Sequence, residues 1–158
     1  MNTASASLPS HYQAKKVGKE LDRHHTNQTV TKTFRFYAAH RNPEAGSRCS
    51  SIHGHRYGLS VCVQHEQVGS LTIPFSDLED AVLKVIGPMD HSLLLYSQDP
   101  AKTMLVASGA CERLYEVPFE TSCENMARFI METLAAAGLN VVSLTLQETD
   151  TSSVTVSV

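Results

Sequence analysis

From residue 30 onward, hydrophobic and polar residues alternate in four segments of the chain. A period of two predicts β-strands, because successive side chains of a strand point to opposite faces of a sheet. Each segment has one apolar and one largely polar face, which is typical of an antiparallel sheet covered on one side. The four segments are VTKTFRFYAAH (30–40), HGHRYGLSVCVQ (53–64), VVSLTLQE (141–148) and SVTVSV (153–158).

Between the second and third of these strands, two segments space their apolar residues at helical intervals. The first, 75–87, has Ser76 as its predicted N-cap. The second, 121–138, begins with Thr121 and Glu124, which fit a capping box. The apolar positions are Phe75, Leu78, Val82 and Ile86 in the first helix and Ala127, Ile130, Met131 and Leu134 in the second.

The order strand-strand-helix-helix-strand-strand predicts an α+β domain over residues 30–158. We expect one four-stranded antiparallel sheet with two helices on one face. The other face is rich in Ser and Thr, so it faces water or lines a wet channel in an oligomer. Residues 1–29 are polar without an apolar period, which predicts a flexible or loosely docked arm, with a short helix as the alternative.

Composition limits the partners and the cellular location expected of this domain. A formal charge of −3 argues against a nucleic-acid partner, since that affinity depends mainly on positive charge. No apolar run approaches the roughly 18 residues expected of a membrane span. The first residues lack the apolar core of a signal peptide, so we expect a cytoplasmic protein whose four cysteines are free thiols.

Three histidines lie at neighbouring strand ends. His53 and His55 share parity with Tyr57, so both are expected to point toward the helix-covered face. His40 ends the first strand on the apolar parity, and a hairpin would bring it beside the pair. Three neutral imidazoles that leave one position open are a recurring arrangement for catalytic zinc. The alternative is a set of hydrogen-bonded histidines without a metal.

Two further features carry chemistry. Asp90 and His91 follow the first helix, and a carboxylate beside an imidazole suits acid–base work, although adjacent Asp and His in a turn are also common. Glu148 has the apolar parity of its strand, so it is expected to point inward, where a carboxylate needs a partner. That partner is either a ligand edge with two N–H donors or an arginine.

The motifs FYAAH, C-x3-HGH-x-Y, DHSLL, TSCEN and QET occur here in order. Over about residues 32–158 the chain therefore resembles the 6-pyruvoyltetrahydropterin synthase / 6-carboxytetrahydropterin synthase family. The resemblance implies the tunnelling fold, in which trimers close a barrel and often stack as hexamers. The polar sheet face would then line the lumen.

The resemblance also implies roles for individual residues. Cys49 would be the thiolate that moves a proton at the substrate's side chain, with Asp90 and His91 as its acid–base partners. Glu148 would anchor the pterin ring. Glu124 would help to form the pterin pocket, although its capping role is an adequate explanation by itself. The zinc ligands would be His40, His53 and His55.

The implied substrate is 7,8-dihydroneopterin triphosphate. Three residues separate Cys49 from His53, which resembles the bacterial 6-carboxytetrahydropterin synthase of the queuosine pathway. That type releases acetaldehyde and triphosphate. The alternatives are 6-pyruvoyltetrahydropterin synthase activity and a non-catalytic zinc- or pterin-binding homologue. Candidate partners for the triphosphate are Lys32, Arg35, Arg41, Arg48 and Arg56.

Overall fold

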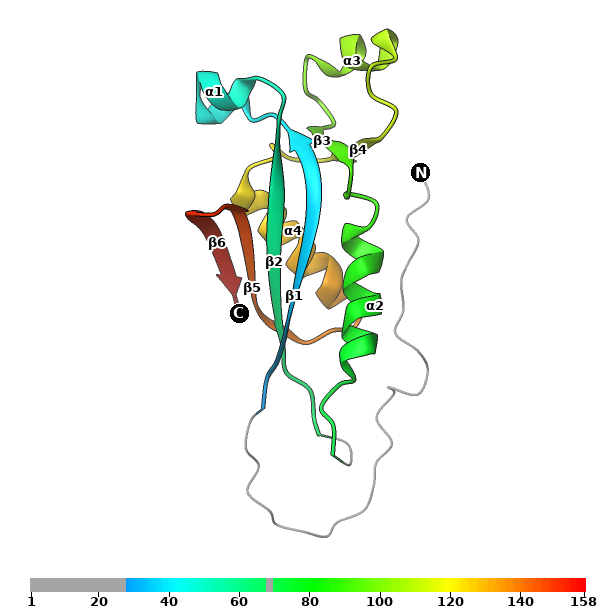
Figure 1. The fold of residues 1–158 in the computed structure, drawn as a ribbon, viewed down its shortest axis with the longest axis vertical. Helices are drawn as coiled ribbons and strands as arrows, with labels where there is room; N and C mark the ends of the chain where they lie inside the picture. Colours follow the sequence, from blue (N-terminus) through cyan, green and yellow to red (C-terminus); the bar gives the residue numbers. More distant parts are fainter. Residues whose placement is uncertain (1–27, 68–69) are drawn as a thin grey trace.

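Six strands form one curled, mixed sheet in the computed structural model, which describes residues 28–67 and 70–158 (Figure 1). The strand order is β4-β3-β1-β2-β5-β6. All but the last two residues of the predicted N-terminal arm lie outside the described residues. The strands are β1 (Val30–His40), β2 (His53–Val63), β3 (Ser92–Tyr96), β4 (Leu114–Val117), β5 (Val141–Thr149) and β6 (Ser152–Ser157).

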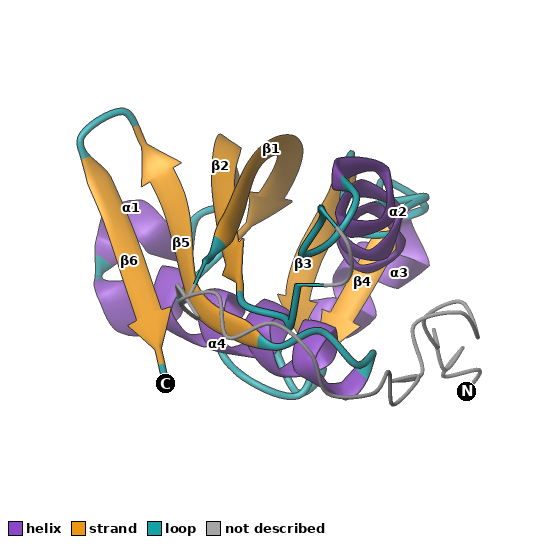
Figure 2. Ribbon diagram, turned by 90° about the horizontal axis from the view of Figure 1, so that it is seen from below, coloured by secondary structure: helices purple, strands orange, loops and turns teal. Residues whose placement is uncertain are grey.

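Two long helices cover one face of this sheet (Figure 2). They are α2 (Phe75–Ile86), which packs against β1, and α4 (Cys123–Ala136), which crosses β5 and β6 and contacts α2. Two short helices, α1 (Ser47–Ser50) and α3 (Lys102–Ser108), lie at the end of the sheet where β1 stops and β2 starts. A single 3-10 turn, η2 (Pro43–Ala45), precedes α1. No helix in the described ranges has the length and apolar character needed to span a membrane.

The predicted α+β class, four strands and two helices are confirmed, but the four-stranded, wholly antiparallel sheet is wrong. Strands β3 and β4 add a parallel pair beside β1. Strand β3 has the sequence SLLLY, and its first four residues are all buried. A strand buried on both faces reads as a continuous apolar run, so it has no period of two to detect. Strand β4 has only four residues.

In the two long helices the core follows the predicted apolar positions with one exception. Leu78, Val82 and Ile86 of α2 are buried, as are the four predicted apolar positions of α4. Phe75 was predicted to share this face, yet its side chain is 63% exposed, because it is the first residue of α2 and lies at its solvent-facing start. Across the β1–β2 hairpin, Phe36 stacks on Tyr57 with ring centroids 5.0 Å apart.

Both predicted N-caps are shifted by a residue or two. Pro74 occupies the N-cap of α2, and Ser76 lies inside the first turn with its hydroxyl on Asp77. At α4, Ser122 is the N-cap, and its hydroxyl accepts the Asn125 backbone N–H. The capping-box prediction failed because the hydroxyl of the preceding threonine is used elsewhere, in a bond to the carbonyl of residue 41.

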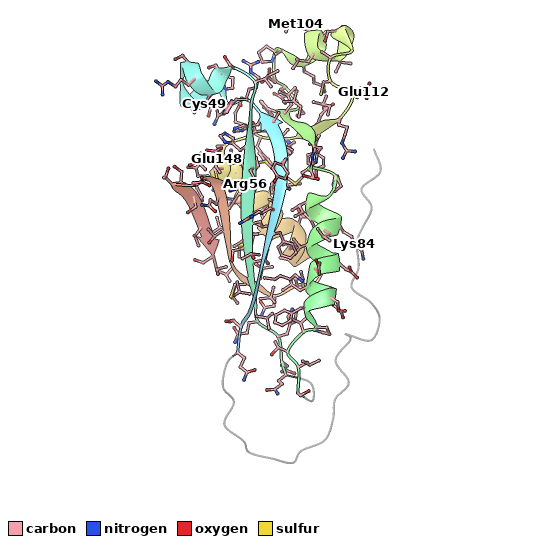
Figure 3. All side chains as sticks on the ribbon, in the orientation of Figure 1. Cys49, Arg56, Lys84, Met104, Glu112 and Glu148 are labelled. Atoms are coloured by element: carbon pink, nitrogen blue, oxygen red, sulfur yellow. The ribbon has the colours of Figure 1, made fainter. Side chains whose placement is uncertain are left out.

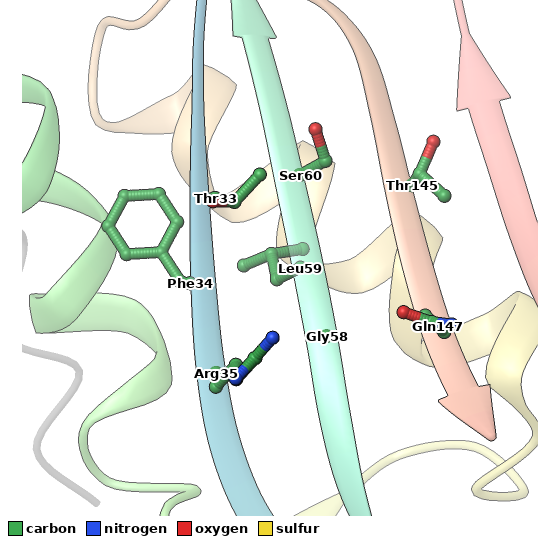
Figure 4. Close-up of a pocket in the computed structure, with 8 residues that line it drawn as sticks. All are labelled: Thr33, Phe34, Arg35, Gly58, Leu59, Ser60, Thr145 and Gln147. Carbon is green, nitrogen blue, oxygen red and sulfur yellow. The ribbon is translucent and has the colours of Figure 1, made fainter. Parts of the chain in front are cut away.

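The uncovered sheet face is polar, as predicted. A hollow of about 390 Å³ lies over β1, β2 and β5. Its lining includes Thr33, Arg35, Ser60, Thr145 and Gln147 (Figure 4). Sheet order leaves β6 with a strand neighbour on one side only, and β1 pairs with β3 only at residues 38–40. These stretches of strand edge therefore lack a strand partner within the described chain.

Candidate metal centre and active site

The β1–β2 hairpin brings the three predicted histidines together. In its register His40 lies opposite His53, and Ala38 lies opposite His55. The ring centroid of His40 is 4.5 Å from that of His53 and 5.2 Å from that of His55. One nitrogen from each ring lies within 4.8 Å of the others, a group compact enough to hold one metal ion.

Hydrogen bonds fix which nitrogen two of these rings offer. The His40 Nδ1 lies 2.8 Å from the Thr121 carbonyl, and the His53 Nδ1 lies 2.8 Å from the Ser51 carbonyl. Because a carbonyl oxygen only accepts, both Nδ1 atoms carry the proton. Each Nε2 then keeps its lone pair free for a metal, the usual way in which a carbonyl orients a ligating imidazole.

The Nε2 of His40 is the strongest local sign of a ligand site. This atom is buried and has no hydrogen-bond partner in the part of the chain that the structure describes. A buried polar atom without a partner costs about 1–3 kcal/mol, so such atoms need an explanation. A metal ion bound by one nitrogen of each of the three rings would satisfy it, and this donor set fits zinc.

Burial also favours the metal-binding form of two of the three rings. It lowers the pKa of His40 and of His55, while the negative charge of Glu148 acts in the opposite direction on both. A lowered pKa means that the imidazole stays neutral to a more acidic pH. Only the neutral ring has a lone pair to donate to a cation.

Glu148 reaches this cluster from β5. Its Oε1 lies 3.6 Å from the His40 Nε2, and its side chain is 26% exposed. The register between β5 and β6 shifts between Gln147 and Thr149, so Glu148 sits at a bulge. Bulges often re-aim a side chain beside a functional site. The ion pairs of the described residues join Glu148 to His40 and not to an arginine.

Cys49 lies on α1, above the start of β2, while Glu148 lies near the end of β5 (Figure 3). The thiol-bearing residue is half-buried. Its carbonyl accepts the Asn42 N–H at 2.7 Å, which ties α1 back to the segment that follows β1. The short helix therefore sits over the same end of the sheet as the three histidines.

Asp90 and His91 form a pair on the other side of β1. The His91 Nδ1 and Asp90 Oδ2 are 2.8 Å apart. The Tyr37 N–H donates to Asp90 Oδ1, the His91 N–H donates to the Tyr37 carbonyl, and the rings of His91 and Tyr37 are in contact. Tyr37 has the opposite parity to His40, so no described contact joins this pair to the histidine cluster within one chain.

Glu124 is exposed on the first turn of α4. It makes no reciprocal cap, since Ser122 and Asn125 satisfy that end of the helix. Its negative charge is one of three causes that raise the pKa of the buried Cys123 thiol to about 12, after burial itself and the charge of Glu148. Glu124 therefore lies near the Glu148 side of the site without a contact that defines its role.

Comparison with known proteins shows to which family the chain belongs. The family model for 6-pyruvoyl tetrahydropterin synthase matches residues 29–158. The chain belongs to this family. It is 35% identical over 133 residues to the 6-carboxy-5,6,7,8-tetrahydropterin synthase of Haemophilus influenzae, which covers 78% of this chain and 94% of that protein. The protein of the same name from Aquifex aeolicus is 28% identical over 152 residues, covering 78% and 93%.

Solved structures agree on the fold. An uncharacterized protein from Wolinella succinogenes superposes with a TM-score of 0.72 at 19% identity, covering 84% of this chain and 98% of that one. The 6-pyruvoyl tetrahydropterin synthase of Caenorhabditis elegans gives a TM-score of 0.63 at 18% identity, covering 84% and 96%. The tunnelling fold expected of a member of the 6-pyruvoyl tetrahydropterin synthase family is thus confirmed.

Two of the basic residues proposed to bind the triphosphate form ion pairs within this chain. Lys32 pairs with Glu79 at 2.8 Å, and Arg41 pairs with Asp99 at 2.8 Å. Arg56 makes only a long, exposed contact with an aspartate. The sequence did not reveal Arg113, whose side chain donates to the Asp90 carbonyl and which lines a hollow of about 780 Å³ with His91 and Arg56. Arg113 lies in the long connection that follows β3, and it belongs to no recognisable motif.

Proposed function

We propose that the chain is a zinc-dependent lyase that converts 7,8-dihydroneopterin triphosphate into 6-carboxy-5,6,7,8-tetrahydropterin, acetaldehyde and triphosphate, in the biosynthesis of queuosine. The observation that carries the proposal is the buried histidine cluster, with its unpartnered Nε2, beside the Glu148 carboxylate. The names of the related proteins support the product assignment.

His40, His53 and His55 would hold the ion, and zinc there would act as a Lewis acid on the side-chain oxygens of the substrate. The chain supplies the remaining chemistry. The Cys49 thiolate would take a proton from the substrate's side chain, and the Glu148 carboxylate would accept paired N–H groups of the pterin ring. A carboxylate that is about one quarter exposed, at a strand bulge, is accessible to such a ligand edge.

The Asp90–His91 pair would complete the site from a neighbouring copy. Its hydrogen bonds to Tyr37 place it on the edge of β1, next to the stretch that has no strand partner in the described chain. An unpaired edge is a template for another strand. Pairing of this edge with β6 of the next copy would close a barrel around the polar face, consistent with the homo-hexamer, a dimer of trimers, that we propose in the cytoplasm.

Product analysis tests the proposal directly. Purified, zinc-loaded protein is incubated with 7,8-dihydroneopterin triphosphate, and the products are identified by mass spectrometry alongside an acetaldehyde assay. Release of acetaldehyde with 6-carboxytetrahydropterin is the expected result. A 6-pyruvoyl product without acetaldehyde would assign the other activity of the family. Unchanged substrate, with zinc bound, would favour a non-catalytic binding protein.

A further inference from the structure

Arg41 joins three separate segments around the proposed site. Its Nε donates to the Ser50 carbonyl at 3.0 Å, and its Nη1 donates to Asp99 Oδ1 at 2.8 Å. Its own carbonyl accepts the Thr121 hydroxyl at 2.7 Å, and the carbonyl of the same threonine orients His40. One residue therefore connects a proposed metal ligand, the helix that carries the proposed catalytic thiol, and a distant carboxylate.

Asp99 is buried and hydrogen-bonded, so its carboxylate is a fixed negative charge opposite Arg41. Its side chain is 1% exposed. Its N–H donates to the Tyr96 carbonyl at 2.9 Å, and its Oδ1 also accepts the Ala101 N–H at 2.7 Å. The second oxygen, Oδ2, is buried without a hydrogen-bond partner among the described residues. Burying a carboxylate is costly unless it is paired, and the cation it is paired with is Arg41.

The helix α1 depends on few contacts. It has four residues, none of them buried, and its N-terminus has no side-chain cap. Two bonds tie its last residues to the segment after β1: Arg41 Nε to the Ser50 carbonyl, and the Asn42 N–H to the Cys49 carbonyl. Because α1 lacks a packed face, loss of one bond should free it substantially.

We propose that Asp99 is a positioning residue. By fixing the guanidinium of Arg41, it holds α1, and with it Cys49, at a set place beside the histidine cluster. The inference rests on the proposed function, in which the Cys49 thiolate acts on the substrate. A misplacement of about 1 Å in a reacting group costs up to about a hundredfold in rate, so a charge outside the site can control turnover.

The test compares Asp99→Ala, Asp99→Asn and Arg41→Lys with a matched control, Lys102→Ala. The lysine lies in the same segment and pairs with Glu116, away from α1. Asparagine keeps the oxygen that accepts the Ala101 N–H, so this variant remains informative if the alanine variant does not fold. Zinc per chain, kcat, KM and amide hydrogen exchange of residues 46–52 are measured for each.

We expect unchanged zinc content and a KM within about twofold of wild type in all variants. The kcat should fall by about tenfold to a hundredfold in Asp99→Ala and Arg41→Lys, and less in Asp99→Asn, with faster exchange in residues 46–52. The control should match wild type in every readout. A lowered melting temperature with normal kcat per zinc-loaded chain would overturn the proposal, as would unchanged exchange.

If the wild-type protein itself releases no product, the proposed function fails. Exchange in residues 46–52 still decides whether Asp99 holds α1, because that measurement needs no substrate. The two failures are therefore distinguishable.

Discussion

Replacing Glu148 with glutamine tests the pterin pocket without disturbing the metal ligands. The carboxylate is about one quarter exposed and lies 3.6 Å from His40 Nε2, outside the three-histidine group. In the proposed complex it accepts two N–H groups of the pterin. Glutamine keeps the size, but it loses the charge and presents an amide donor where an acceptor is needed. Hydrogen bonds to a charged group contribute about 1.5–3 kcal/mol, which corresponds to about a tenfold to a hundredfold loss of affinity.

The assay is a calorimetric titration of a reduced pterin that lacks the triphosphate, so that binding is measured without turnover. Zinc content, measured by elemental analysis, should be the same in Glu148→Gln and wild type. Glu132→Gln is the matched control, because Glu132 is exposed on α4 and is not a proposed site residue. Equal affinities of wild type and Glu148→Gln would refute the reasoning and leave a zinc site without a pterin pocket.

Three further outcomes are expected. His53→Ala should lose zinc or bind it far more weakly, because the substitution removes one of three proposed ligands. A full zinc complement in this variant, measured by elemental analysis, would contradict the proposed metal site. Cys49→Ala should keep zinc and the circular-dichroism spectrum but lose turnover by about a hundredfold or more, whereas Cys62→Ala should turn over normally. At about pH 8, iodoacetamide should label Cys62 well before Cys123. A hydrogen bond with Thr31 lowers the pKa of Cys62. Burial raises the pKa of Cys123 to about 12, so its thiol stays protonated and unreactive. Early labelling of Cys123 in peptide mapping would show that it is not buried as described.

Strand parity predicted much of the fold because one face of the sheet is buried and the other is polar. In β1 and β2 the alternation of buried and exposed residues is nearly unbroken, and the hairpin register follows from it. The same rule failed for β3, whose burial on both faces removes the alternation. Helix caps were less predictable, since Thr121 and Ser122 are both capable of capping and only tertiary contacts decide which one does.

In the candidate site, too, features that depend on strand parity were predictable and features that depend on tertiary contacts were not. The approach of His40 to His53 and His55 was predictable, since all three lie on one parity of a single hairpin. The inward direction of Glu148 was also predictable, but its bulge was not, because a bulge depends on the partner strand. Arg41 and Asp99 are 58 residues apart and carry no motif, so only the folded chain reveals their ion pair.

Asp90 and His91 show where local patterns stop being informative. They lie between a helix and a strand, where no periodicity applies, and His91 has a φ of 56°, in the left-handed region. Their hydrogen bonds to Tyr37 place them at the edge of β1, on the parity opposite to His40. Strand β1 thus carries one histidine of the proposed metal site on one face, and the Asp90–His91 pair is hydrogen-bonded at its edge. In the proposed oligomer, these two groups of one chain would serve two different active sites, so the reaction would require assembled copies rather than a single chain.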